Sequence, residues 1–303
     1  MLRSTLLALS QSPRVHRFVI HNSLSRRVVR RFVAGESLDD AVAAVRAVNQ
    51  AGCLASLDCL GESVASESEA RAAAEVYASM FDRVASEHLD CNVSLKLTQL
   101  GLDISQPLCE SLLEEIIARA VAHRNFIRID MEGSAYTERT INICKRMQAK
   151  TDAIGTVLQS YLYRTEKDAR DLTAAGVRLR LVKGAYKEPP NIAFPQKADV
   201  DANYIKVMKI LLTSGLYHGI ATHDPLMHQA TKEFVKEQGI SNDQFEFQML
   251  YGIRTDLQQQ LIREGYRLRV YIPYGTDWFP YFMRRLAERP ANLKFFVSNL
   301  FRG

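Results

Sequence analysis

Residues 178–186 of the chain read RLRLVKGAY, and this stretch decides how the fold is interpreted. Its leucines alternate with Arg178 and Arg180, which is the period of a β-strand with two chemically different faces. An unpaired cation buried in a protein core is strongly disfavoured. Arg180 and Lys183 are tolerable where a bound anion or a polar ring faces them, so the stretch indicates a strand that ends in a functional site.

Composition sets broad limits on the class of protein. The 303 residues fit either two ordinary domains or one large α/β barrel. Hydrophobic residues make up 47% and charged residues 24%, and no apolar run reaches the roughly 18 residues that a membrane span requires. The five cysteines and seven histidines show neither zinc-site spacing nor a disulfide framework. No metal site is expected.

The N-terminal segment is strongly basic. Residues 1–35 contain seven arginines and no acidic residue, in a chain whose net charge is +5. Such a serine-bearing segment resembles a mitochondrial transit peptide, but a helical apolar period runs through residues 16–50 into the body of the protein. This favours a helical arm over residues 1–45 that lies on acidic lipid or packs on the domain. We expect a cytoplasmic protein with possible peripheral contact to the inner membrane face.

From residue 53 onward, β-rich runs alternate with segments of helical period. Strands are predicted at 53–58, 91–97, 125–131, 154–159, 178–183, 218–223, 245–250 and 268–273. Helices are predicted at 66–88, 109–122, 136–149, 165–176, 198–214, 225–238, 254–264 and 276–288. This alternation predicts an α/β fold, a (β/α)8 TIM-type barrel over residues 46–303, and no Rossmann or P-loop glycine motif follows any strand. The long proline-bearing connection 188–201 is expected to form a lid-like excursion.

Polar residues occupy the carboxyl ends of the predicted strands, where barrel enzymes place their active sites. They are Asp58, Glu62, Lys96, Asp130, Gln159, Arg180, Lys183, Thr222, His223 and Tyr271. Any one of them is as compatible with a structural salt bridge as with function, and His223 or Gln159 alone fits a hydrogen-bonded interior residue. Their recurrence around the barrel favours an active site.

The segment 276–288 gives a second signal. Tyr281, Arg284, Arg285 and Glu288 share one helical face, and apolar residues take roughly the opposite face. A charged helical face is usually only solvated. This helix, however, follows the eighth strand directly and so lies beside the barrel mouth, where two adjacent arginines can clamp a carboxylate.

Seven short segments form an ordered set along the chain. They are SLKL (94–97), RIDME (128–132), LQSY (158–161), LVKGAY (181–186) after Arg180, ATHD (221–224), FQMLYG (247–252) and YFMRRLAER (281–289). Together they resemble the proline dehydrogenase family, in its monofunctional bacterial form, from Leu57 to Arg289. The resemblance implies FAD-dependent oxidation of L-proline to Δ1-pyrroline-5-carboxylate, with hydride passing from proline C5 to flavin N5 and electrons passing to a membrane quinone.

On the substrate side, the resemblance implies a carboxylate clamp, two aromatic walls and a catalytic pair. The clamp and walls correspond to Lys96, Arg284, Arg285, Tyr271 and Tyr281. The catalytic residues correspond to Asp130, expected to pair with Lys96, and to Arg180 near flavin N5. Glu62 is similar to the acid that pairs with Arg284 when the final helix closes, which implies a gate.

On the cofactor side, the resemblance implies FAD contacts along the ends of the third to sixth strands and on the final helix. The corresponding residues are Met131, Gln159, Arg180, Lys183, Gly184, Ala185, Thr222, His223 and Glu288. Glycine at position 184 would permit close approach of the backbone to the cofactor.

Two other interpretations remain open at this stage. One is a barrel enzyme that uses Lys96 or Lys183 as a Schiff-base nucleophile, which requires a lysine of lowered pKa. The other is a module that binds nucleic acid through the arginine-rich arm. The second leaves the polar strand ends unexplained, so we expect no nucleic-acid partner.

Overall fold

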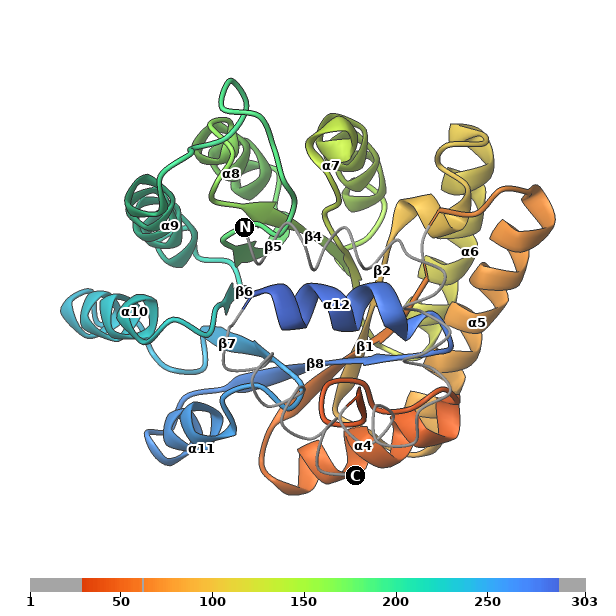
Figure 1. Ribbon diagram of the computed structural model, residues 1–303, viewed down its shortest axis with the longest axis horizontal. Helices are drawn as coiled ribbons and strands as arrows, with labels where there is room; N and C mark the ends of the chain where they lie inside the picture. Colours follow the sequence, from red (N-terminus) through yellow and green to blue (C-terminus); the bar gives the residue numbers. More distant parts are fainter. Residues whose placement is uncertain (1–28, 62, 289–303) are drawn as a thin grey trace.

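The computed structural model describes residues 29–61 and 63–288, which form a closed barrel of eight parallel strands surrounded by helices (Figure 1). Each strand pairs with the next one along the chain, and β8 closes the ring against β1. The (β/α)8 fold predicted from the sequence is confirmed.

The elements follow one another in the predicted order. The strands are β1 (Leu54–Cys59), β2 (Cys91–Leu95), β3 (Ile127–Ile129), β4 (Ile154–Gln159), β5 (Arg178–Val182), β6 (His218–Ala221), β7 (Phe245–Leu250) and β8 (Leu268–Tyr274). The helices are α4 (Leu38–Gln50), α5 (Glu67–Ser86), α6 (Gln106–Ala122), α7 (Ser134–Gln148), α8 (Thr165–Ala174), α9 (Lys197–Leu212), α10 (Pro225–Glu237), α11 (Thr255–Arg263) and α12 (Trp278–Glu288). A short 3-10 helix, η1 (Leu97–Leu100), follows β2.

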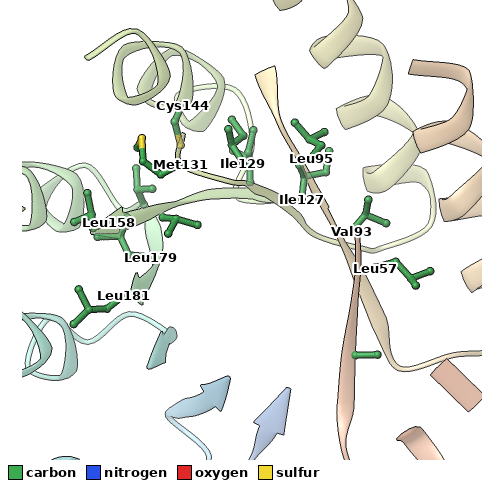
Figure 2. Packing of buried hydrophobic residues seen from close by; sticks show 14 of the residues in the cluster. Leu57, Val93, Leu95, Ile127, Ile129, Met131, Cys144, Leu158, Leu179 and Leu181 are labelled. Atoms are coloured by element: carbon green, nitrogen blue, oxygen red, sulfur yellow. The ribbon is translucent and has the colours of Figure 1, made fainter. Parts of the chain in front are cut away.

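The side-chain alternation along the strands separates two environments. Leu57, Leu95, Ile129, Leu179 and Leu181 point away from the barrel axis toward the helices (Figure 2). They belong to one buried cluster that joins strands and helices. Because successive strand residues face opposite sides, the polar residues between them face the barrel interior. The hydrophobic driving force for this fold therefore comes mainly from the layer between sheet and helices.

Local sequence signals account for the helix starts. Ser37 and Asp40 form a capping box at α4, in which each side chain accepts from the other's backbone N–H. Ser66 and Ser105 cap α5 and α6 through the N–H groups of Glu69 and Leu108. Helix α5 begins one residue after its predicted start at 66, and α6 begins three residues before its predicted start at 109.

Helix α7 starts at a glycine cap, and its capping group comes from a distant segment. The carboxylate of Glu188, in the long connection after β5, accepts from Ser134 N at 2.8 Å and from Ser134 Oγ at 2.5 Å. The same connection pairs with the β4–α8 loop through the bridge between Leu162 and Ala193. The predicted excursion is thus an ordered layer over the β4 and β5 ends.

The final helix lies across the barrel mouth (Figure 1). Trp278, Phe279 and Phe282 are buried in a second hydrophobic cluster that also contains Val29 and Phe32. The cluster reaches Leu60 after β1 and Ile253 after β7, so the helix is anchored at the carboxyl end of the barrel.

The N-terminal arm is described only from residue 29. The helical period through residues 16–50 does not correspond to one continuous helix in its described part, because turns and bends separate Val29 from α4. Helical structure stops at Val29, Gly35 at φ +146° lies in the connecting segment, and Ser37 caps the start of α4. Ala41 and Val45 of α4 join the main core. The division between arm and barrel at residue 45, which falls within α4, stays a prediction.

Two buried histidines make the fold sensitive to acid. His218 is fully buried; its Nδ1 accepts from Leu179 N at 2.9 Å and its Nε2 lies 2.8 Å from Ser214 Oγ. Burial lowers the pKa of His218 from 6.5 to about 3, and burial likewise lowers the pKa of His228 to about 4. A base with a lowered folded-state pKa stabilises the fold above the unfolded value and loses that contribution as the pH falls.

We therefore expect the free energy of unfolding to fall as the pH is lowered from about 6.5 toward 4, by about 1.4 kcal/mol per pH unit for each histidine. Urea denaturation at pH 7 and pH 5 measures this loss. His218→Asn keeps an acceptor for Leu179 N and should show a smaller loss between the two pH values. His88→Asn, at an exposed position, is the matched control and should keep the wild-type loss. Equal losses for His218→Asn and wild type would refute the assignment.

Candidate active site

Hydrogen bonds between non-neighbouring strands show where the polar side chains point. Arg180 on β5 donates to Ser94 Oγ on β2, and Tyr271 on β8 donates to the carboxylate of Asp130, which follows β3. In a closed ring of strands such pairs can meet only through the interior. Ser94, Asp130, Arg180 and Tyr271 therefore converge inside the mouth of the barrel.

The centre of the site is the guanidinium of Arg180, whose side chain is 6% exposed. It donates from Nη1 to Asp130 Oδ1 at 2.7 Å, from Nη2 to Ser94 Oγ at 3.2 Å and from Nε to Gln248 Oε1 at 2.5 Å. The ring of Tyr271 lies 5.2 Å from the guanidinium carbon, within cation–π range. Contacts to four other strands or strand ends hold this cation in one orientation.

Lys96 has a different partner from the one predicted. Its Nζ lies 3.0 and 3.2 Å from the two oxygens of Asp58. The expected direct pair between Lys96 and Asp130 is wrong, because the carboxylate of Asp130 is bound by Arg180 and by Tyr271 OH, at 2.8 Å. Asp130 still acts on Lys96 through its charge.

Burial and charge set the protonation of the pair formed by Lys96 and Asp58. Burial alone would lower the pKa of Lys96, but the charges of Asp58 and Asp130 outweigh it and raise that pKa. Burial raises the pKa of Asp58, with Lys96 opposing the effect. Lys96 is therefore a firmly protonated cation near the mouth, which is the opposite of what a Schiff-base lysine requires.

At the β4 and β5 ends, Gln159 and Lys183 are both tied to protein groups. Gln159 Nε2 donates to Glu132 O at 3.0 Å. Lys183 Nζ lies 2.5 Å from Asp201 and 2.6 Å from Asp224, so this lysine is held between two carboxylates. These partners were not predicted from the sequence, and the cofactor contacts of both residues stay predictions.

Gly184 is required at its position for two reasons. Its φ is +121°, which side chains rarely adopt, and a Cβ there would lie 2.4 Å from the ring of Tyr161. In this structure, the group that approaches the Gly184 backbone closely is thus the ring of Tyr161. Ala185 beside it is exposed, and its contact with a cofactor stays a prediction.

The polar side chains at the β6 end bind backbone groups of the protein, whereas the sequence suggested contact with a cofactor. His223 Nε2 accepts from Leu250 N at 2.9 Å, which bridges β6 and β7. Thr222 is buried and its Oγ1 accepts from Asp224 N at 3.1 Å.

Met131, which follows β3, is 7% exposed and belongs to the buried cluster that also holds Cys144 and Leu158 (Figure 2). The roles of Met131, Thr222 and His223 toward a cofactor stay predictions.

On α12, Tyr281 is buried and lies under a cation. The guanidinium carbon of Arg285 is 5.2 Å from the centre of the Tyr281 ring. Only the backbone of Arg284 and Glu288 is described, and Glu62 lies outside the described residues. The predicted clamp and the pair between Glu62 and Arg284 therefore stay predictions.

The sequence reasoning missed part of the polar interior. The missed residues are Ser94, Glu246, Gln248 and Arg269. A signal was available: in FEFQML (245–250), two aromatic residues alternate with Glu246 and Gln248, as the arginines of β5 alternate with leucines. Within the described residues, no group of three His, Cys, Asp or Glu side chains could hold a metal ion, and no helix is long and apolar enough to span a membrane.

Comparison with known proteins places this chain in a family. The family model described as proline dehydrogenase matches residues 41–298. Over 300 residues the chain is 44% identical to proline dehydrogenase 1 of Bacillus subtilis (strain 168), covering 99% of both chains. The chain belongs to the proline dehydrogenase family. The enzyme class inferred from the sequence is thereby confirmed.

Other proline dehydrogenases support the same assignment. The chain is 39% identical to the proline dehydrogenase of Deinococcus radiodurans, covering 100% of this chain and 99% of the relative. It also superposes on the crystal structure of proline utilization A from Bdellovibrio bacteriovorus inactivated by N-propargylglycine, with a TM-score of 0.82 and 25% identity. That match covers 87% of this chain but 33% of the larger protein.

The partner of Lys96 can be tested by coupling energies. Lys96→Met leaves Asp58, whose side chain is 1% exposed, without its counter-ion, and we expect a loss of about 3–5 kcal/mol of stability. Urea denaturation should show that combining Lys96→Met with Asp58→Asn costs much less than the sum of the single changes. The control cycle pairs Lys96→Met with Asp130→Asn and should show a smaller coupling. A larger coupling to Asp130 would restore the pairing expected from the sequence.

Proposed function

We propose that this protein catalyses the FAD-dependent oxidation of L-proline to Δ1-pyrroline-5-carboxylate. The observation that carries the proposal is the convergence of Arg180, Lys96 and Asp130 inside the barrel mouth, beneath the helix that bears Arg285. A small amino-acid anion and a redox cofactor need cations, held in place, in this arrangement. Family membership supports the same conclusion.

The residues at the β4–β5 ends fit a bound flavin by their chemistry. Arg180 and Lys183 carry positive charge, and Gln159 presents an amide, while Gly184 adds no side chain at the exposed turn after β5. In the proposal Arg180 and Gln159 contact the flavin ring, and residues 183–185 approach the ribityl and pyrophosphate groups. Met131, Thr222, His223 and Glu288 complete the cofactor side.

The substrate carboxylate would be bound by Arg284, Arg285 and Lys96. Because Asp58 keeps Lys96 protonated, this lysine presents a permanent positive charge. Tyr271 and Tyr281 would enclose the ring of the substrate. Fixing the carboxylate end orients the opposite carbon, C5, toward the cofactor, which lowers the entropic part of the barrier.

The bound flavin would supply the redox chemistry, by accepting hydride from C5 of proline at N5. The ring nitrogen of proline must be uncharged for its lone pair to form the C=N bond of the product. Arg180 stabilises negative charge that develops opposite it, and its pairing with Asp130 and Tyr271 keeps its donors oriented before the reaction.

The Schiff-base alternative is disfavoured by the environments of both candidate lysines. Lys96 is held protonated by Asp58. Lys183 is bound to two carboxylates, Asp201 and Asp224. A nucleophilic lysine needs an apolar or cationic environment that favours the neutral amine.

An anaerobic titration tests the proposal. The purified, FAD-loaded protein should show a flavin absorbance spectrum that L-proline bleaches, and Arg285→Met should need at least about tenfold more proline for half-bleaching, because a charged clamp contact is lost. Arg263→Met, an exposed arginine on α11, is the matched control and should behave as wild type. Absence of bleaching in the wild type would refute the function, and equal titrations for Arg285→Met and wild type would refute the clamp.

We further propose that electrons leave to a membrane quinone and that the basic arm brings a cytoplasmic protein to the bilayer. The seven arginines of residues 1–35 supply the charge for contact with anionic lipid. Flotation with anionic liposomes should recover the intact chain, and a chain lacking residues 1–30 should stay unbound. Neutral liposomes serve as the control. Equal flotation of both chains on anionic liposomes would remove this part of the proposal.

A further inference from the structure

Beneath Arg180, a line of hydrogen-bonded side chains continues through the barrel interior, away from the mouth. Arg180 Nε donates to Gln248 Oε1 at 2.5 Å, and Gln248 Nε2 donates to Glu246 Oε1 at 2.5 Å. The exposures of the three residues are 5%, 4% and 2%. Gln248 and Glu246 are two residues apart on β7, so both face the interior.

The lower end of this line is firmly anchored. Arg269 on β8 binds Glu246 through Nε at 2.7 Å and Nη2 at 3.0 Å, and Tyr217 OH donates to Glu246 at 3.0 Å. Burial by itself raises the pKa of Glu246, but the charge of Arg269 and these hydrogen bonds outweigh burial and lower it. Glu246 is therefore a fixed, ionised acceptor within the described interior.

An ionised Glu246 determines how the amide of Gln248 is oriented. A guanidinium only donates hydrogen bonds and a carboxylate only accepts them, whereas a glutamine amide has one end of each kind. Between Arg180 and Glu246, only one orientation satisfies both neighbours: oxygen toward the arginine and nitrogen toward the glutamate. The reversed amide would place N–H groups against N–H groups at Arg180.

The backbone of β6, the strand beside β7, lies so close to the Gln248 amide that a side chain at Gly219 would clash with it. A Cβ at Gly219 of β6 would lie 2.3 Å from Gln248 Nε2 and 2.7 Å from its Cδ. Gly219 pairs in register with Glu246, so the missing side chain faces the point where the two β7 residues meet. The backbone of β6 thus forms one wall of the space that holds Gln248.

We propose that Gln248, oriented by Glu246 and Arg269, is a positioning residue that sets the guanidinium plane of Arg180. This inference rests on the proposed function, in which Arg180 lies against the flavin. Asp130 and Ser94 hold the guanidinium from the mouth side and from β2, and Gln248 supplies the contact at Nε. Without that contact, rotation about the end of the side chain moves the charge away from the place where negative charge develops.

The test is Gln248→Met, which keeps the length of the side chain and removes both hydrogen bonds without adding charge. We expect the FAD-loaded variant to lose about 10- to 100-fold in kcat while KM for proline changes little, because a misplaced catalytic group affects the transition state more than substrate binding. The midpoint potential of the bound flavin should become more negative than in wild type, since the nearby cation is displaced. A purely structural role for Gln248 would leave that potential unchanged.

Two further variants keep the test decisive. Gly219→Ala should displace the Gln248 amide and produce the same loss of kcat and the same direction of potential change, without altering any polar residue. Gln258→Met makes the same replacement at a buried glutamine of α11 that bonds only to backbone carbonyls, and it should behave as wild type. Each variant is loaded with FAD and its flavin content measured before the kinetics.

The outcomes separate this inference from the proposed function. If wild type is not reduced by proline, the proposed function fails. If wild type is reduced and both Gln248→Met and Gly219→Ala retain its kcat and flavin potential, the function stands and the positioning role is refuted. If the Gln258→Met control loses kcat and shifts the flavin potential as much as Gln248→Met does, the effect is general and the positioning role is again refuted.

Discussion

The structure depends on one constraint, which is that a buried guanidinium must be satisfied inside a closed ring of strands. Arg180 meets it by bonding to side chains on β2 and β7 and just after β3. Leaving such a cation unpaired in the interior would cost several kcal/mol. Burying Arg180 in the interior therefore requires hydrogen-bond acceptors on the surrounding strands. These acceptors belong to a network that runs from Tyr271 near the mouth to Arg269 deeper in the barrel.

This network reverses the usual filling of a barrel of this type. Branched apolar side chains commonly fill the interior of (β/α)8 barrels. Here the strands send Leu57, Ile129 and Leu181 outward against the helices and send serine, arginine, glutamate and glutamine inward (Figure 2). The apolar layer supplies the favourable burial energy, and the interior is available for a polar site.

The sequence predicted the fold closely because its signals are local. Strand and helix periods are read within a few residues, and the elements lie close to the predicted ranges. Asp130, Arg180 and Tyr271, which meet in the barrel mouth, were among the strand-end residues named from the sequence, but their pairs were not predicted. Register places Lys96 one residue beyond the pair Leu95–Ile129, beside Asp130, yet Arg180 and Tyr271 occupy that carboxylate. Such competition depends on side chains from distant strands, which no single stretch of sequence contains.

The same network links stability to catalysis. Asp130, Arg180, Glu246 and Arg269 alternate in charge along the interior, so each ion has an opposite neighbour or a bridging amide. Removing any one of them leaves a buried charge uncompensated and lowers the stability of the barrel, whatever its role toward the substrate. Only neutral links such as Gln248 can be changed without creating a charge imbalance. The positions at which function can be separated from folding are thus the uncharged members of the network, and loss of activity at its charged members does not by itself identify a catalytic group.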